Sequence, residues 1–114
     1  MSADVIDAVR VLRFDRAEQA DSATPTTTRE HYASADGTFK SGFWAGKPGK
    51  AEVHYQKDEL CVLLEGKVRL TDAAGHVETY EAGDVFLIPA GFKGLWETLE
   101  PTRKIYALNK PGEA

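Results

Sequence analysis

Short apolar runs alternate with glycine, proline and aspartate from about residue 37 to the end of the chain. Each run spans a few residues and is rich in valine, leucine and aromatic residues, which is typical of strands and too short for most helices. Eight runs follow this pattern: GTFKSGFWAG, AEVHYQK, ELCVLLEG, KVRLTDAAG, HVETYEAG, DVFLIPAG, GLWETLEP and RKIYALN. We therefore expect an all-β domain, and a jelly-roll barrel because that fold closes many short antiparallel strands in few residues.

Glycines between the runs predict the turns. Glu65-Gly66 and Ala74-Gly75 place glycine where a hairpin needs a positive φ, and Pro89-Ala90-Gly91 is typical of a rigid turn. The first 36 residues have a weaker pattern. There VRVLRF, residues 9–14, is compatible with a strand, and DRAEQADSATPTTT predicts a loop with a helical turn around residues 16–20. We expect residues 1–36 to form a strand-and-loop segment that packs on a barrel of residues 37–114.

Composition places the chain among ordinary globular proteins. It has 114 residues, enough for one domain with its own core, of which 42% are hydrophobic and 28% charged. The formal net charge is −4, and lysine and arginine are scattered among the acids, which argues against binding to nucleic acid or to anionic membranes.

The lack of a recognisable signal peptide and the single cysteine both favour a cytoplasmic location. The start, MSADVIDAVRVLRF, is interrupted by charges and lacks the apolar region of a signal peptide, and no apolar run is long enough to span a bilayer. Cys61 is the only cysteine, which excludes an intrachain disulfide and fits a reducing compartment.

The stretch GDVFLIPAGFKGLWET, residues 83–98, resembles the second motif of the cupin family, G-x5-P-x-G-x2-H-x3-N. Gly83, Pro89 and Gly91 match this motif. Gly94, however, stands at the histidine position, and Thr98 stands at the asparagine position.

The first cupin motif, G-x5-H-x-H-x3-E-x6-G, aligns on Glu59 and Gly66, which puts Val53 and Tyr55 at its two histidine positions. KDELCVLLEGKVRLTD and the lead-in FKSGFWAGKPGKAEVHY are similar to a small single-domain group related to the (S)-ureidoglycine aminohydrolase cupin domain. The resemblance covers about residues 37 to 108 and implies a cupin barrel, that is, a double-stranded β-helix. Those aminohydrolases are two-cupin chains with a histidine-bearing metal centre.

Strand alternation predicts which side chains enter the barrel. If the family's ligand positions point inward, so do Val53, Tyr55, Lys57 and Glu59, whereas His54 faces the other way. His31, in a loop-like segment, and His76, after a turn, are expected to be solvated. A metal needs three or four convergent donors, and this register supplies Glu59 alone, so we predict no metal and no other cofactor.

The candidate ligand pocket contains seven residues: Trp44, Tyr55, Lys57, Glu59, Cys61, Trp96 and Lys104. Lys57 and Glu59 form either a polar pair that grips a carboxylate- or amide-bearing ligand, with the lysine as a possible base, or a charge pair filling the vacated metal space. The aromatic residues line a pocket or form ordinary core. Cys61 is expected to be a plain buried thiol. The resemblance implies that Lys104 lies near the barrel mouth, and we expect Lys93 to be a solvated turn residue.

Three functions follow as hypotheses, and no catalytic residue is assigned. The first is a cytoplasmic cupin that binds a small polar metabolite without the usual metal. The second is an enzyme of nitrogen metabolism like ureidoglycine aminohydrolase, and the third is a non-catalytic sensing or interaction subunit. We also expect a homodimer, because ELCVLL and DVFLI carry apolar side chains on both strand faces and the outer face needs cover.

Overall fold

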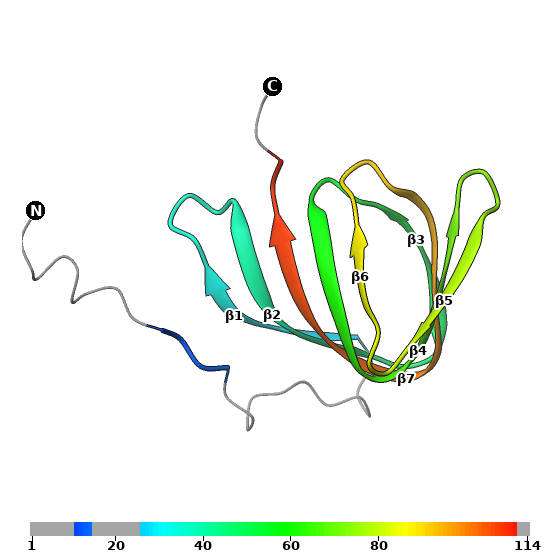
Figure 1. Cartoon of the computed structure of the whole chain (residues 1–114), viewed down its shortest axis with the longest axis horizontal. Coiled ribbons are helices and arrows are strands. Elements are labelled where there is room, and N and C mark those ends of the chain that lie inside the picture. Colours follow the sequence, from blue (N-terminus) through cyan, green and yellow to red (C-terminus); the bar gives the residue numbers. More distant parts are fainter. Residues whose placement is uncertain (1–10, 15–25, 112–114) are drawn as a thin grey trace, which may run out of the picture.

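The computed structural model describes residues 11–14 and 26–111. These residues form seven strands: β1 (Thr27–Ala33), β2 (Phe39–Gly46), β3 (Gly49–His54), β4 (Asp58–Asp72), β5 (Val77–Glu81), β6 (Val85–Ile88) and β7 (Lys93–Asn109). All strand pairs are antiparallel, so the predicted all-β class is confirmed (Figure 1). The described part of the chain has no helix long and apolar enough to cross a membrane.

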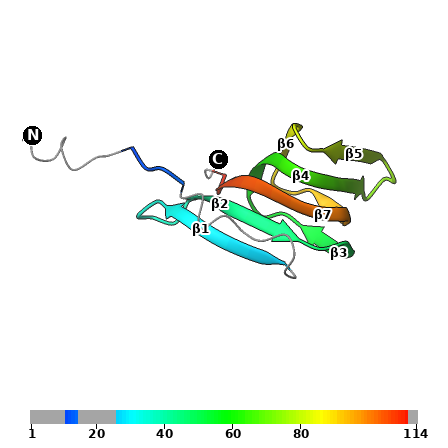
Figure 2. The same cartoon turned by 90° about the horizontal axis from the view of Figure 1, so that it is seen from below.

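Two long strands divide the sheet into facing layers. The C-terminal half of β7 and the N-terminal half of β4 pair with each other, and β2 and β6 flank them, with β1 outside β2. The other halves of β7 and β4 also pair with each other and are flanked by β3 and β5. The sheet therefore curls on itself as a jelly roll, with its two layers facing each other (Figures 1 and 2).

Gly66 lies where β4 bends from one layer to the other. The pairing of β4 with β7 shifts register between Leu63 and Val68, and Gly66 has a φ of +97°. A Cβ at this position would collide with the Thr102 side chain and the Pro101 carbonyl of the adjacent strand. Only glycine fits both the backbone angle and the close approach of β7.

The bend at Gly66 corrects one prediction. Glu65-Gly66 was expected to form a hairpin between two short strands, but β4 continues through it as a single strand of 15 residues. The glycine that predicted a turn instead takes its positive φ in a β-bulge, which curves a strand without ending it. Similarly, GLWETLEP and RKIYALN join in the 17-residue strand β7.

The other two predicted turns are confirmed. Gly75, with a φ of +88°, donates its backbone N–H to the carbonyl of Asp72 between β4 and β5. Gly91, with a φ of +95°, lies in the turn after Pro89. That turn is closed by a 3.1 Å hydrogen bond from the Phe92 N–H to the Pro89 carbonyl.

The strand of the N-terminal segment is β1, which lies later in the sequence than VRVLRF. Residues 11–14 of VRVLRF form no strand, while residues 9 and 10 and the predicted helical turn at residues 16–20 lie outside the described residues. Phe14 packs against Phe43, with ring centroids 5.4 Å apart. His31 was expected in a loop but lies on β1, where its ring stacks on Phe14 at 4.8 Å, so the segment before residue 37 contributes an edge strand to the sheet.

The core lies between the layers. It is formed by inward-facing residues of β4, β6 and β7: Cys61, Leu63, Val68, Leu70, Phe86, Ile88 and Trp96. Leu63, Val68 and Cys61 are fully enclosed. The core fills one part of the barrel and leaves a cavity in the other, where polar groups gather.

Candidate functional site: a buried lysine in the barrel cavity

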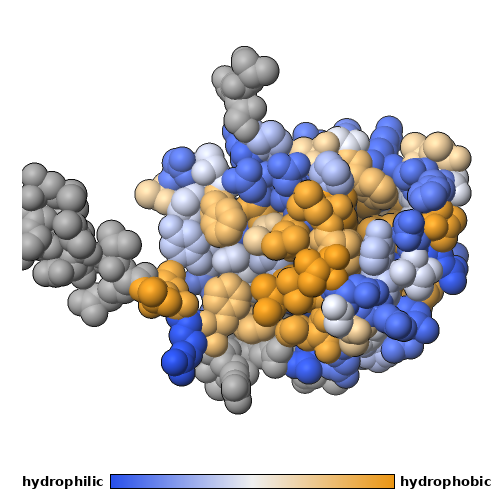
Figure 3. Space-filling view, in the orientation of Figure 1, coloured by the Kyte–Doolittle hydropathy of each residue, from blue (hydrophilic) through white to orange (hydrophobic). Residues whose placement is uncertain are grey.

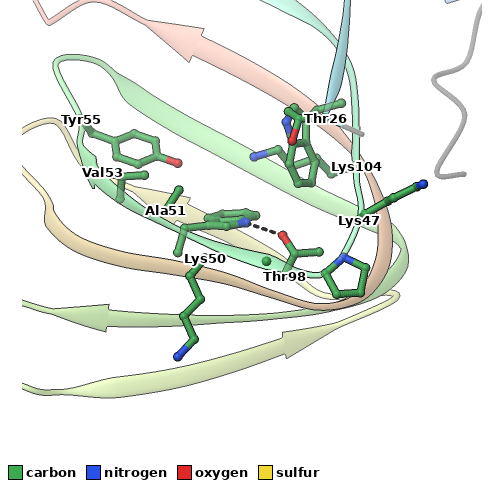
Figure 4. A pocket seen from close by; sticks show the side chains of 12 residues that line it. Thr26, Lys47, Lys50, Ala51, Val53, Tyr55, Thr98 and Lys104 are labelled. Carbon is green, nitrogen blue, oxygen red and sulfur yellow. Dashed lines mark hydrogen bonds between the residues drawn. The ribbon is translucent and has the colours of Figure 1, made fainter. Parts of the chain in front are cut away.

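The cavity between the two layers has a volume of about 410 Å³ (Figure 4). Trp44 from β2, Trp96 and Lys104 from β7, and Tyr55 from the segment after β3 contribute to its wall. This volume suits a small molecule, and aromatic walls with a few polar groups are the usual composition of such a site.

Lys104 carries the charge inside the cavity. Its side chain is only 6% exposed, and its Nζ donates a 2.8 Å hydrogen bond to Oε2 of Glu59, whose side chain is 8% exposed. The same ammonium lies 3.7 Å from Sγ of Cys61. The pairing compensates two charges that would each be costly to bury alone.

Two indole rings surround this ammonium. Nζ of Lys104 is 4.3 Å from the ring centroid of Trp96 and 5.0 Å from that of Trp44. The rings meet edge to face at 5.7 Å across the two layers. Nε1 of Trp96 donates a 2.9 Å hydrogen bond to Oγ1 of Thr98, which fixes the ring (Figure 4). Cation–π contacts thus add to the ion pair in holding Lys104.

The turn at Pro89–Phe92 positions Tyr55. The Tyr55 N–H donates to the carbonyl of Phe92 at 2.9 Å, and the Gly91 N–H donates to the carbonyl of Tyr55 at 2.7 Å. Burial raises the pKa of the Tyr55 phenol far above its ordinary value, and the negative charge of Glu59 raises it further. The phenol is therefore neutral near pH 7 and keeps its proton beside the Glu59 carboxylate.

Cys61 is fully buried beneath the lysine. Burial raises the pKa of its thiol to about 12, and the opposing effect of the nearby Lys104 ammonium is smaller. The thiol is consequently protonated at neutral pH, which agrees with the expectation of a plain buried thiol.

Lys57 does not line the cavity, unlike Tyr55 two residues before it. The alternation that put it beside Glu59 does not run through this segment, because β3 ends at His54 and β4 begins at Asp58. Lys57 lines a different surface depression, with Gln56 and Leu108, to which Tyr55 also contributes. The partner of Glu59 is Lys104 in place of Lys57.

Sequence reasoning missed two lysines at the cavity. Lys47, directly after β2, and Lys50, on β3, line its rim with their side chains directed outward (Figure 4). A pair of lysines flanking Pro-Gly was the available signal. Lys93 is exposed as expected, but it begins strand β7 and pairs with His54.

Residues 33–106 match the family of EutQ-like cupin domains. The chain belongs to this cupin family. A DUF861 family protein from Thermotoga maritima is 36% identical over 58% of this cupin and 75% of its own chain, with a TM-score of 0.57. The ethanolamine utilization protein Q of Salmonella typhimurium is 25% identical over 88% of this cupin and 78% of its own chain, with a TM-score of 0.68.

More distant cupins share the fold alone. The cupin domain of Schizosaccharomyces pombe Cnp3 covers 90% of this chain and 76% of its own at 16% identity, with a TM-score of 0.70. Among curated proteins, none matches the chain. The cupin barrel is thus established, and the finer resemblance to ureidoglycine aminohydrolase stays a prediction.

The residues of this cupin do not fit the metal of other cupins. Of the four positions aligned with the metal ligands, Val53 and Gly94 have no donor atom, Tyr55 holds its proton, and Glu59 is already paired with Lys104. The described residues contain no group of three or more histidine, cysteine, aspartate or glutamate side chains able to hold a metal ion. His54 is exposed, and His76 has a side chain that is 70% exposed.

Packing explains the glycine at the histidine position. Gly94 on β7 lies between Val53 of β3 and Asp72 of β4. A Cβ at Gly94 would collide with the backbone carbonyl of Thr71. The position is therefore closed to any side chain unless β4 and β7 move apart.

Proposed function

We propose that this cupin binds a small polar metabolite in the cavity around Lys104, with the lysine ammonium in place of the family's metal. The observation that carries the proposal is the buried Lys104–Glu59 ion pair in the wall of an aromatic cavity. A buried ion pair is often no more stabilising than well-packed apolar residues of similar volume, so fold stability alone does not account for it. Ionisable groups that converge in a cavity are typical of binding sites.

Two other functions differ from this one in whether the ligand is chemically converted and in whether a second protein is bound. An enzyme like ureidoglycine aminohydrolase would consume its ligand, and a sensing subunit would bind a second protein. Neither is favoured by a particular contact in the described residues. The Salmonella typhimurium relative is named for ethanolamine utilization, which makes small amino alcohols reasonable test compounds alongside acids and amides. We expect no nucleic-acid or membrane partner and a cytoplasmic location.

Mass spectrometry of co-purifying metabolites tests the proposal. The native protein and the double variant Lys104→Met/Glu59→Gln are purified in parallel, denatured, and the released small molecules are compared. The double variant removes both charges together and leaves no unpaired buried ion. We expect a compound enriched on the native protein and lost from the variant. Equal amounts from both proteins, or no enriched compound, would contradict binding at this site.

Trp44 and Trp96 provide a second readout. They are the only tryptophans in the chain, and both line the cavity, so intrinsic fluorescence reports its occupation directly. A compound found by mass spectrometry is expected to change this fluorescence saturably. Analysis of the same mixture after incubation shows whether the compound is consumed, which is the result that an aminohydrolase-like enzyme requires.

A further inference from the structure

We infer that the ligand is a small organic carboxylate whose charge contacts Lys104 and whose apolar part lies against the two tryptophans. The inference rests on the proposed binding function and adds the chemical class of the ligand. Three observations support the inference. They are the charge of the cavity wall, the hydrogen-bond donors that have no partner in the described part of the protein, and the contact of both tryptophan rings with the Lys104 ammonium.

The cavity wall is positive. Among the described residues, its lining includes Lys47, Lys50 and Lys104 and no aspartate or glutamate. Glu59 lies behind Lys104, and Glu97 lies 3.8 Å from the ammonium of Lys50, so Lys47 is the lining lysine that has no ion pair within the described residues. Lys47, whose side chain is directed outward at the entrance, gives it a net positive charge that attracts anions and repels cations (Figure 4).

Two hydrogen-bond donors remain for a ligand beside one indole ring. The Lys104 ammonium has three N–H groups, of which one contacts Glu59 and another is directed toward Cys61. The hydroxyl of Thr98 accepts from Trp96, and its own hydrogen has no acceptor among the described residues. Both Lys104 and Thr98 line the cavity. A pair of donors suits a carboxylate, which has two acceptor oxygens.

The aromatic faces are already occupied by a cation. Indole rings would otherwise favour an ammonium ligand, but the ammonium of Lys104 lies against both Trp44 and Trp96. An amine ligand would bring a second positive charge to this place, where Glu59 is already paired with Lys104 and the described lining residues include no carboxylate. The cavity therefore disfavours amino alcohols and favours anions.

Three probes of the same shape and different charge test the inference: benzoate, benzamide and benzylamine. Binding is measured by tryptophan fluorescence and calorimetry at constant ionic strength and pH 7, up to about 50 mM because ligands this small bind weakly. We expect benzoate to bind at least about tenfold more tightly than benzamide, and benzylamine to bind more weakly than either, because a charge-assisted contact is stronger than a neutral one.

Variants assign the preference to Lys104. In Lys104→Met/Glu59→Gln, benzoate is expected to lose its advantage over benzamide, while circular dichroism and thermal unfolding show an intact fold. Lys110→Gln, which removes an exposed lysine outside the cavity lining, is the matched control and should retain the advantage. Lys47→Gln/Lys50→Gln should weaken benzoate binding by a few-fold, and less at high salt.

The outcomes separate the inference from the proposed function. If benzamide or benzylamine binds as tightly as benzoate and competes with the co-purified metabolite, binding at the cavity stands and the carboxylate class is wrong. If the double variant keeps the preference for benzoate, Lys104 is not its source and the inference is overturned. If no probe binds the native protein and no metabolite co-purifies, the proposed function fails as well.

Discussion

At the residue scale, Lys104 and Glu59 depend on each other. Removing one partner leaves the other charge buried and unpaired, whereas replacing both leaves none. Lys104→Met is therefore expected to lower the free energy of unfolding by about 3–5 kcal/mol, and Lys104→Met/Glu59→Gln to recover most of this loss. Urea unfolding measures both values.

The exposed pair of Arg103 and Glu65 is the matched control for this prediction. Its side chains are 30% and 48% exposed, and Nε of Arg103 lies 2.6 Å from Oε2 of Glu65. Arg103→Met should cost less than about 1 kcal/mol, because water screens exposed pairs. Equal losses for Arg103→Met and Lys104→Met would show that the cavity pair is solvated.

Cys61 offers a pH-dependent test of the same interior. With its pKa raised to about 12, the native thiol remains protonated where an unfolded thiol, with a pKa of about 8.5, ionises. Alkylation by iodoacetamide at pH 9 should therefore be slow in the native protein and fast in urea. By linkage, this group stabilises the fold fully below about pH 8.5 and loses its contribution as pH rises toward 12. Rapid native alkylation would mean that the thiol is open to solvent.

The same residues show what sequence predicts about a site. Tyr55, Trp44, Trp96 and Lys104 line the cavity, and Glu59 and Cys61, also predicted for the pocket, contact Lys104 from outside the lining. Lys57 does not line the cavity, because strand alternation holds only within a continuous strand. The pairing of Lys104 with Glu59 joins residues 45 positions apart, and such a contact depends on strand register, which local pattern does not determine.

At the element scale, Gly94 tests how closely β4 and β7 pack. Gly94→Ala puts a methyl group against the Thr71 carbonyl and is expected to lower the free energy of unfolding by about 1–3 kcal/mol. Gly49→Ala is the control, since Gly49 also lies in a strand and its added Cβ would meet only the Lys47 carbonyl, at 4.0 Å. Chemical unfolding should show little change for the control. Equal effects would contradict the close packing.

Element boundaries show where the pattern stops being informative. Hydrophobic alternation and turn residues predicted the strands and two of the three turns because these depend on neighbouring residues. Glycine at 66 had the same local signature as a turn residue, but the strand continues because β7 runs alongside both halves of β4. Whether a positive φ ends a strand or bends it depends on this tertiary pairing.

At the scale of the whole molecule, the outer face of β4 and β6 remains apolar and exposed. Val85 is 61% exposed and Leu87 is 59% exposed, with Leu60 and Leu64 beside them. Hydrophobic side chains gather near the middle of the view in Figure 3, where β4 and β6 run in Figure 1. We expect a homodimer that covers this face.

Light scattering at low micromolar concentration measures the mass. We expect dimer for the native chain and monomer for Val85→Lys/Leu87→Glu, whose charges would be buried in the interface. Val77→Lys, an equally drastic change at a 50% exposed valine of β5, should remain dimeric. A monomeric native protein would contradict the expectation.

The central claim is that Lys104, and not a bound metal ion, supplies the positive charge in the cavity of this cupin. Elemental analysis of protein purified without a histidine tag, after mild dialysis, tests it most directly. Because Gly94 and Val53 have no donor and Glu59 is paired with Lys104, zinc, iron, manganese and nickel should all be far below stoichiometric. Near-stoichiometric metal that disappears in Glu59→Ala or His54→Ala would contradict the claim and make the metal-dependent aminohydrolase the better hypothesis.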